Sequence, residues 1–157
     1  MLFRSRAQRA GAAFVRAFWR TDAQCLADCI SAGVVDRSIR PNMLVAAALA
    51  RSPLSNEQRA AVVATATQHL RTDMGLRTLA ASDPAYRGRY EGTVLARDAA
   101  YHQGTVWPWL SGFYVEAALR SAPTARRKQV ARELTAWLAG LLPERSEEHT
   151  SELQSPC

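Results

Sequence analysis

Apolar residues recur at helical spacing through much of this 157-residue chain, and no segment alternates apolar and polar residues convincingly over five or more positions. A helix that packs on one face repeats its apolar residues about every 3.6 positions, whereas a half-buried strand repeats them every second position. The cleanest stripe consists of Val130, Leu134, Trp137, Leu138 and Leu141. The pattern therefore predicts an all-α fold.

Residues that begin or end helices divide the chain into segments. Pro41 and Asn42 precede an almost purely apolar stretch, which predicts a mostly buried helix with Asn42 as its N-cap. Ser55 and Gln58 have the spacing of a capping box, which predicts a helix start. The expected helices cover residues 7–20, 42–51, 55–71, 106–121 and 124–142.

Two long connections separate these helices. Residues 21–41 form an irregular stretch in which Gly33 and Asp36 mark turns, and residues 76–104 have no helical period. Loops of this length within a compact domain are usually functional or disordered. The tyrosines of the second connection argue against disorder, so it is the first place to expect a binding site.

Charge and cysteine content narrow the function classes. The net charge is +6, carried almost entirely by arginines scattered along helical segments, which favours solvated helix faces over a nucleic-acid patch. No apolar run is long enough to cross a bilayer, and residues 1–9 lack the features of a secretory signal, so we expect a cytoplasmic protein with no membrane partner. Cys25, Cys29 and Cys157 have no zinc-type spacing, which favours free thiols and predicts neither a metal nor a cofactor.

The residue types needed for sugar binding gather in one short segment. A sugar ring presents hydroxyls at its edge and C–H groups on its faces, so its site needs polar side chains beside flat aromatic rings. Residues 97–104 supply the polar groups, Trp107 and Trp109 supply rings, and Gly104 permits close backbone approach. A helix expected to begin near Trp107 would direct its N-terminus at the bound molecule. The alternative is that both tryptophans are core anchors and that His102 is a satisfied interior residue.

Several short motifs follow one another along the chain. They are Ile39-Arg40-Pro41-Asn42, Ser52-Pro53-Leu54, Gly75-Leu76-Arg77-Thr78-Leu79, the run from Asp83 to Tyr90, Arg97-Asp98, and the run from Tyr101 to Leu110. In this order they resemble the motifs of the amylo-α-1,6-glucosidase domain found at the C-terminal end of glycogen debranching enzymes, and the resemblance covers nearly all of residues 1–144. One departure is visible, since the family usually continues Gly-Pro-Phe where this chain has Gly112 followed directly by Phe113.

The resemblance implies an (α/α)6 toroid, of which this chain would supply about the last third. The implied reaction is inverting hydrolysis of α-1,6-linked glucose stubs on an α-glucan such as glycogen or limit dextrin. The general acid and base are expected outside the chain, and Asp36 and Asp98 are expected to contact substrate or support residues that do. The expected substrate-binding residues are Asp98, Tyr101, His102, Gln103, Trp107 and Trp109, with Arg40, Asn42, Arg77 and Tyr86 in support.

Residues 145–157 do not continue the preceding pattern. The segment from Arg145 to Gln154 back-translates into the start of a common DNA-sequencing adapter, so we expect residues 1–144 to be the genuine fragment and 145–157 a disordered artefact. Such a fragment is expected to be inactive and to lack the remainder of its barrel. The alternatives are a non-catalytic α-helical repeat module and an (α/α)6 hydrolase of another sugar, such as trehalose or mannosylglycerate.

Overall fold

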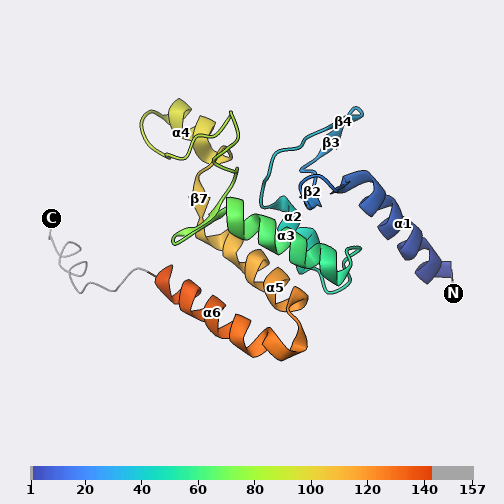
Figure 1. Cartoon of the computed structure of the whole chain (residues 1–157). Helices are drawn as coiled ribbons and strands as arrows, with labels where there is room; N and C mark the ends of the chain where they lie inside the picture. Colours follow the sequence, from blue (N-terminus) through green and yellow to red (C-terminus); the bar gives the residue numbers. More distant parts are fainter. Residues whose placement is uncertain (1, 143–157) are drawn as a thin grey trace, which may run out of the picture.

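The computed structural model of the chain describes residues 2–142, and within them six α-helices hold most of the residues (Figure 1). The predicted helical character is confirmed, although three small sheets accompany the helices. The expected artefactual segment 145–157 lies outside the described residues. The helices are α1 (Leu2–Phe18), α2 (Asn42–Ala48), α3 (Asn56–His69), α4 (Val94–Tyr101), α5 (Ser111–Ser121) and α6 (Arg127–Gly140), with 3-10 turns η1 (Pro108–Leu110) and η2 (Thr124–Arg126).

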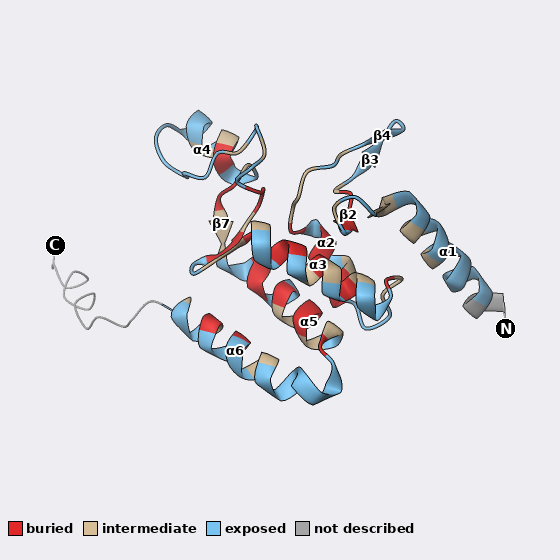
Figure 2. Cartoon of the chain, viewed as in Figure 1, coloured by how far each residue is buried: buried red, intermediate tan, exposed pale blue. Residues whose placement is uncertain are grey.

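Helix α5 is the centre of the packing. It contacts α2, α3 and α6, and the buried residues gather on the faces that these helices turn toward one another (Figure 2). The ring of Tyr114 on α5 meets the ring of Trp137 on α6 edge-on at 5.3 Å, and the guanidinium of Arg71 lies 4.5 Å from the Trp137 ring. The stripe predicted on α6 therefore faces the core, with Leu134 and Trp137 buried.

The two predicted helix starts had different outcomes. The capping box is confirmed, because the Ser55 hydroxyl accepts from the backbone N–H of Gln58 and the Gln58 side chain accepts from the backbone N–H of Ser55. The prediction of Asn42 as an N-cap is wrong. Pro41 occupies that position, and the Asn42 side chain instead donates to Asp28 at 2.8 Å. A tertiary partner, which local sequence does not reveal, takes the amide that would otherwise cap the helix.

The stretch predicted as irregular, 21–41, contains one short hairpin and the second strand of another. The first predicted helix ends at Phe18 rather than residue 20, because Trp19 and Arg20 pair with Leu26 and Cys25. Gly33 lies in the turn of the second hairpin, as expected, with a φ of +80°. The strands are β1 (Trp19–Arg20) with β2 (Cys25–Leu26), β3 (Ile30–Ser31) with β4 (Val34–Val35), and the three-stranded sheet of β5 (Arg71–Thr72), β6 (Gly75–Arg77) and β7 (Val106–Trp107).

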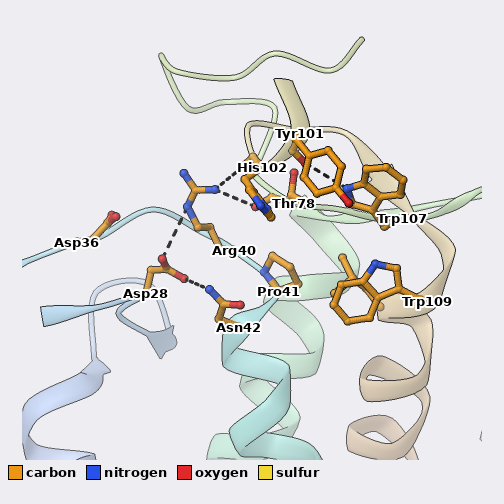
Figure 3. Close-up of a pocket in the computed structure, with 11 residues that line it drawn as sticks. Asp28, Asp36, Arg40, Pro41, Asn42, Thr78, Tyr101, His102, Trp107 and Trp109 are labelled. Atoms are coloured by element: carbon orange, nitrogen blue, oxygen red, sulfur yellow. Dashed lines mark hydrogen bonds and ion pairs between the residues drawn. The ribbon is translucent and has the colours of Figure 1, made fainter. Parts of the chain in front are cut away.

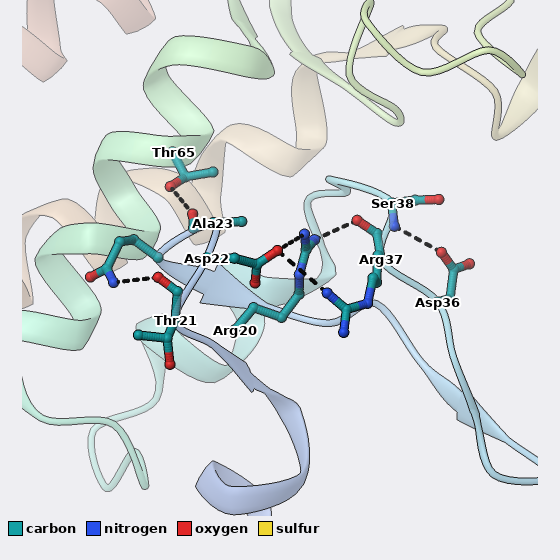
Figure 4. Close-up of polar contacts among 9 residues, drawn as sticks. Arg20, Thr21, Asp22, Ala23, Asp36, Arg37, Ser38 and Thr65 are labelled. Atoms are coloured by element: carbon teal, nitrogen blue, oxygen red, sulfur yellow. Dashed lines mark hydrogen bonds and ion pairs between the residues drawn. The ribbon is translucent and has the colours of Figure 1, made fainter.

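Polar contacts brace this hairpin region and join it to α3 (Figure 4). Arg20 donates to Asp22 at 3.0 Å and to the backbone oxygen of Arg37, and the Thr65 hydroxyl on α3 donates to the backbone oxygen of Ala23 at 3.4 Å. The hydrogen bond from Arg20 lowers the pKa of Asp22. The contacts of Arg20 therefore lie within the region before α2, and the Thr65 hydroxyl joins that region to α3.

The helix predicted over 106–121 begins later than expected. Val106 and Trp107 pair with Arg77 and Leu76 as β7, and η1 then leads into α5 at Ser111. Gly75 makes this pairing possible. Its φ is +126°, and a Cβ there would lie 2.9 Å from the Cα of Pro108, so only glycine fits.

Helix α4 lies in the connection 76–104, where no helix was predicted. The hydroxyl of Thr93 caps it by accepting from the backbone N–H of Ala96. Val94 and Leu95 are exposed, and Ala100 is its one buried residue, so α4 presents no apolar stripe for a periodicity argument to detect. Across residues 2–142, no helix has both the length and the apolar character needed to cross a membrane.

Candidate functional site

A pocket of about 400 Å³ opens where the start of α2, the end of α4 and η1 meet (Figure 3). Polar groups from the segment before α2 form one side of it, and aromatic rings from α4, β7 and η1 form the other. The motif Ile39-Arg40-Pro41-Asn42 and the run from Tyr101 to Leu110 thus meet at the pocket, although about sixty positions of the chain separate them. The lining residues are Asp28, Asp36, Arg40, Pro41, Asn42, Thr78, Tyr101, His102, Trp107, Trp109 and Leu110.

Arg40 connects the two sides of the pocket. Its guanidinium donates to the backbone oxygens of Thr78 and His102 and, at 2.8 Å, to the side-chain oxygen of Gln103. The Nε of Arg40 lies 3.8 Å from Oδ2 of Asp28, and both side chains are largely buried. The planar guanidinium carries donors on three nitrogens in a fixed fork and can bind acceptors that lie apart, whereas the three donors of a lysine share one nitrogen. Arg40 therefore fixes the position of residues 102–103 relative to α2.

Two carboxylates lie on the polar side. Asp28 accepts from Asn42 in addition to its ion pair with Arg40. Asp36 accepts from the backbone N–H of Ser38 at 2.8 Å, and this hydrogen bond lowers the pKa of its carboxyl, with a smaller contribution from the charge of Arg40. Hydrogen bonds to protein donors thus stabilise the charged form of Asp36.

The aromatic side is a packed cluster with an open face. The rings of Tyr101 and Trp107 lie 4.8 Å apart, and the indole N–H of Trp107 donates to the backbone oxygen of Tyr101 at 3.1 Å. The ring of Tyr90 meets both of them edge-on. Trp109 is 66% exposed and makes an edge contact with Phe113. The cluster therefore presents one braced ring pair and one accessible indole.

Gly104 lets the turn after α4 close tightly. Its φ is +131°, and a Cβ there would lie 2.4 Å from the ring of Tyr86. Its backbone N–H donates to the hydroxyl of Thr78 at 2.9 Å, and the Thr105 hydroxyl donates to the backbone oxygen of Ala100 at 2.8 Å. These contacts hold Tyr101 and His102 at the mouth of the pocket.

The structure separates the predicted site residues into two groups. Arg40, Asn42, Tyr101, His102, Trp107 and Trp109 line the pocket, and so does Asp36. The remaining four do not line it. Gln103 binds Arg40, Tyr86 packs on Gly104, Arg77 is half-buried in β6, and Asp98 is exposed on α4.

Reasoning from sequence missed Asp28, Pro41, Thr78 and Leu110 as lining residues. Pro41, Thr78 and Leu110 stand inside the motifs that were recognised, so their positions could have been inferred from their neighbours. Asp28 belongs to no such motif, and nothing local marks it. Its role follows from the hydrogen bond to Asn42 and the ion pair to Arg40, which exist only in the folded chain.

One group of possible metal ligands adjoins the pocket. A carboxylate oxygen of Asp28, the thiol of Cys29 and a carboxylate oxygen of Asp36 lie within 4.8 Å of one another. Both carboxylates already bind protein donors, and a thiolate is a softer ligand than the oxygens beside it. The described residues give no further sign of a metal centre here.

Comparison with known proteins identifies the family. A sequence model of the family described as amylo-alpha-1,6-glucosidase matches residues 1–155. The chain belongs to this amylo-alpha-1,6-glucosidase family. The glycogen debranching enzyme of Saccharomyces cerevisiae (strain ATCC 204508 / S288c) is 34% identical over 88 residues. These residues make up 52% of this chain and 6% of the yeast protein, so the chain spans a small part of that relative.

Proposed function

We propose that this chain supplies one side of a glucose-binding pocket in an enzyme that hydrolyses α-1,6-linked glucose stubs on glycogen-like α-glucans. The observation that carries the proposal is the pocket itself, in which exposed aromatic rings face a group of hydrogen-bonding side chains. The pocket is built from the motifs by which the chain resembles the family. A yeast relative named as a glycogen debranching enzyme supports the choice of an α-glucan.

The accessible rings would stack on the C–H face of a glucose unit. Trp109 is suited to this role because its indole is exposed, and Tyr101 because its ring is braced by Trp107. Asn42 and His102 would form hydrogen bonds with the hydroxyls of the glucose unit from the polar side of the pocket. Arg40 acts differently, since its donors bind the protein, and we assign it the positioning of residues 102–103.

The catalytic acid and base are assigned to parts of the enzyme outside this chain. Inverting glycosidases hold their two carboxyl groups roughly 6.5–9.5 Å apart, with room for a water molecule. The oxygens of Asp28 and Asp36 approach to within 4.8 Å, and the lowered pKa of Asp36 is opposite to what a general acid needs. Asp98 is exposed and does not line the pocket, so we infer that all three carboxylates have supporting roles.

We also infer that the helices belong to a partial (α/α)6 toroid. Two pairs of consecutive helices, α2 with α3 and α5 with α6, pack as neighbouring hairpins, which is the repeating unit of such a toroid (Figure 1). The rest of the barrel would come from other parts of the enzyme. Cys25 and Cys29 are free thiols, which supports a reducing compartment such as the cytoplasm.

The proposal is tested by titrating the chain with isomaltose, which contains the α-1,6 linkage, while tryptophan fluorescence is recorded. We expect a saturable change that the variant Trp109→Leu removes. Phe113→Leu is the matched control, because Phe113 is a partly exposed ring beside Trp109 that does not line the pocket. An absence of saturation, or equal binding by both variants, would contradict the proposed site.

A second measurement tests the assignment of the catalytic groups. The chain is incubated with limit dextrin, and released glucose is assayed. We expect no release, because the acid and the base are assigned elsewhere. Glucose release that depends on Asp28 or Asp36 would show that the chain carries its own catalytic carboxylates, and that assignment would be wrong.

A further inference from the structure

A second polar cavity lies at the other end of the helices. The glucose pocket adjoins the first residue of α2 and the turn before α5, whereas this cavity of about 410 Å³ lies beside Ala50, just after α2, and Arg120, in the last turn of α5. Three arginines, Arg59, Arg120 and Arg127, line it. An adjoining cavity of about 350 Å³ shares two of these arginines, so together they form a single arginine-rich groove.

Arg59 is the unusual member of this group. It is 7% exposed, its Nη1 donates to the backbone oxygen of Ala47 at 2.9 Å, and its Nε is buried without a hydrogen-bond partner among the described residues. Burial, and secondly the charge of Arg120, lower the pKa of Arg59. A buried guanidinium with an unused donor is costly unless an acceptor is supplied. Arg59 therefore places a largely buried positive charge with few protein acceptors in the wall of the cavity, where an anion would balance it.

The surrounding charges point to an anion. Glu116 is the one acidic residue lining the cavity with Arg59, and it is paired with Arg120 across one turn of α5. Glu57 lines the adjoining part of the groove, where it is exposed and accepts from the hydroxyl of Ser55. The hydrogen bond of the Arg127 side chain is a long one, with its Nη2 lying 3.5 Å from the backbone oxygen of Ala122. Three guanidinium groups thus share the groove with two carboxylates, so the charged side chains that line it have a net positive charge.

Helix α3 adds a fourth source of positive potential. Its first residue, Asn56, lines both cavities, and Arg59 follows one turn later on the same helix. The N-terminal end of a helix carries partial positive charge and is a common anion site. Asn56 and Arg59 are three positions apart, so the capping box that starts α3 also places them on the same side of the helix.

We propose that this groove binds a phosphate group, either as inorganic phosphate or as the phosphate monoester of a small molecule. Arg59, Arg120 and Arg127 would be its donors. One guanidinium group can donate two parallel hydrogen bonds to two oxygens of the same phosphate. The cavity also has room for more than a bare ion. The site is separate from the glucose pocket and does not depend on the function proposed for that pocket.

The test measures the thermal unfolding midpoint of the chain against the concentration of inorganic phosphate, and separately of glucose 6-phosphate, at constant ionic strength. A ligand that binds the native state stabilises it by RT ln(1 + [L]/Kd), so the midpoint rises with the logarithm of ligand concentration above Kd, and the affinity follows from that dependence. We expect such a rise with phosphate, and tighter binding of glucose 6-phosphate if the natural ligand is a monoester. Equal affinity for both would identify free phosphate as the ligand.

Variants separate specific binding from general screening. Arg120→Gln and Arg127→Gln are each expected to weaken phosphate affinity about tenfold, since each removes a charge-assisted hydrogen bond. Arg132→Gln is the matched control, because Arg132 is exposed on α6 and lines neither cavity. Equal affinity in all three variants would overturn the proposal, and so would an equal response to chloride. Arg59→Lys tests the buried donor while keeping its charge and is expected to weaken binding as well.

Discussion

Replacing Arg40 by methionine tests whether one side chain holds the pocket together. Methionine keeps an unbranched apolar stem like that of arginine but has no donors. The substitution removes the hydrogen bonds to Thr78, His102 and Gln103 and leaves Asp28 without its ion-pair partner. We expect the variant to fold with a lower free energy of unfolding.

The magnitude follows from the contacts. A hydrogen bond to a charged group contributes roughly 1.5–3 kcal/mol, so three such bonds would give about 5–9 kcal/mol if they were additive. They share one guanidinium, and water can reach the exposed His102, so the sum is an overestimate. Arg40 and Asp28 have 16% and 12% of their side chains exposed, so solvent screening is limited. We expect a loss of about 2–4 kcal/mol, somewhat below the roughly 3–5 kcal/mol lost when a fully buried pair is broken.

Urea unfolding followed by far-UV circular dichroism measures this loss. With an ordinary slope for a domain of this size, the midpoint should fall by about 1–2 M urea. Arg40→Lys should lose less, because it keeps the charge beside Asp28 but not the planar fork. Arg37→Met is the matched control. Arg37 pairs with Asp22 at 3.4 Å, but 66% and 56% of the two side chains are exposed, so no measurable change is expected.

A local measurement distinguishes this reasoning from a general loss of stability. Hydrogen exchange at the backbone amides of Gln103 and Gly104 should accelerate in Arg40→Met more than exchange in the core of α3. If Arg40→Met and Arg37→Met were equally stable, the guanidinium would not be a structural link. If exchange rose uniformly, the link would not be specific to the turn after α4.

Two further predictions concern the same region. Gly104→Ala should destabilise the fold by more than about 1 kcal/mol, because the φ of Gly104 is +131° and an added Cβ would collide with Tyr86. The control Gly112→Ala in α5 adds a Cβ that meets nothing within 4 Å, so it should be neutral or mildly stabilising. Equal thermal midpoints for the two variants would contradict this prediction. The lowered pKa of Asp36, caused mainly by the backbone N–H of Ser38, means that its charge stabilises the fold above the unfolded pKa of about 3.9 and that this contribution is lost as pH falls through the lower folded pKa. The stability deficit of Asp36→Asn in urea should therefore be full at neutral pH and shrink on acidification below about pH 4, and a deficit independent of pH would refute the assignment.

The helices whose start or buried face depends on local sequence alone were predicted best. Helix α3 follows from the capping box at Ser55, and the core face of α6 follows from the spacing of Leu134 and Trp137. Both features involve groups within about one or two turns of each other, so local sequence determines them. Helix α4 was missed because its apolar residues give no inward stripe. Val94 and Leu95 are exposed, and Ala100 is its one buried residue, so the local cap of Thr93 stands without the pattern that would confirm a helix.

Pairings between distant segments required the tertiary structure. Trp107 has the sequence surroundings of a helix start, but it pairs with Leu76 as a strand because Gly75 allows the backbones to approach. The same holds for Arg40, whose acceptors His102 and Gln103 are 62 and 63 positions away. No local period encodes such contacts, because they form only when the intervening chain has folded.

The amino-acid sequence by itself determined the helical class, the start of α3, the buried face of α6 and the motifs that indicate the amylo-alpha-1,6-glucosidase family. The tertiary structure decided which of those motif residues face the pocket, brought in Asp28, and turned Gln103 and Tyr86 into supports of the turn rather than lining residues. The physical reason is that helix starts and apolar stripes depend on neighbours a few positions apart. A pocket depends instead on which distant groups can satisfy one another's hydrogen bonds once the core has closed.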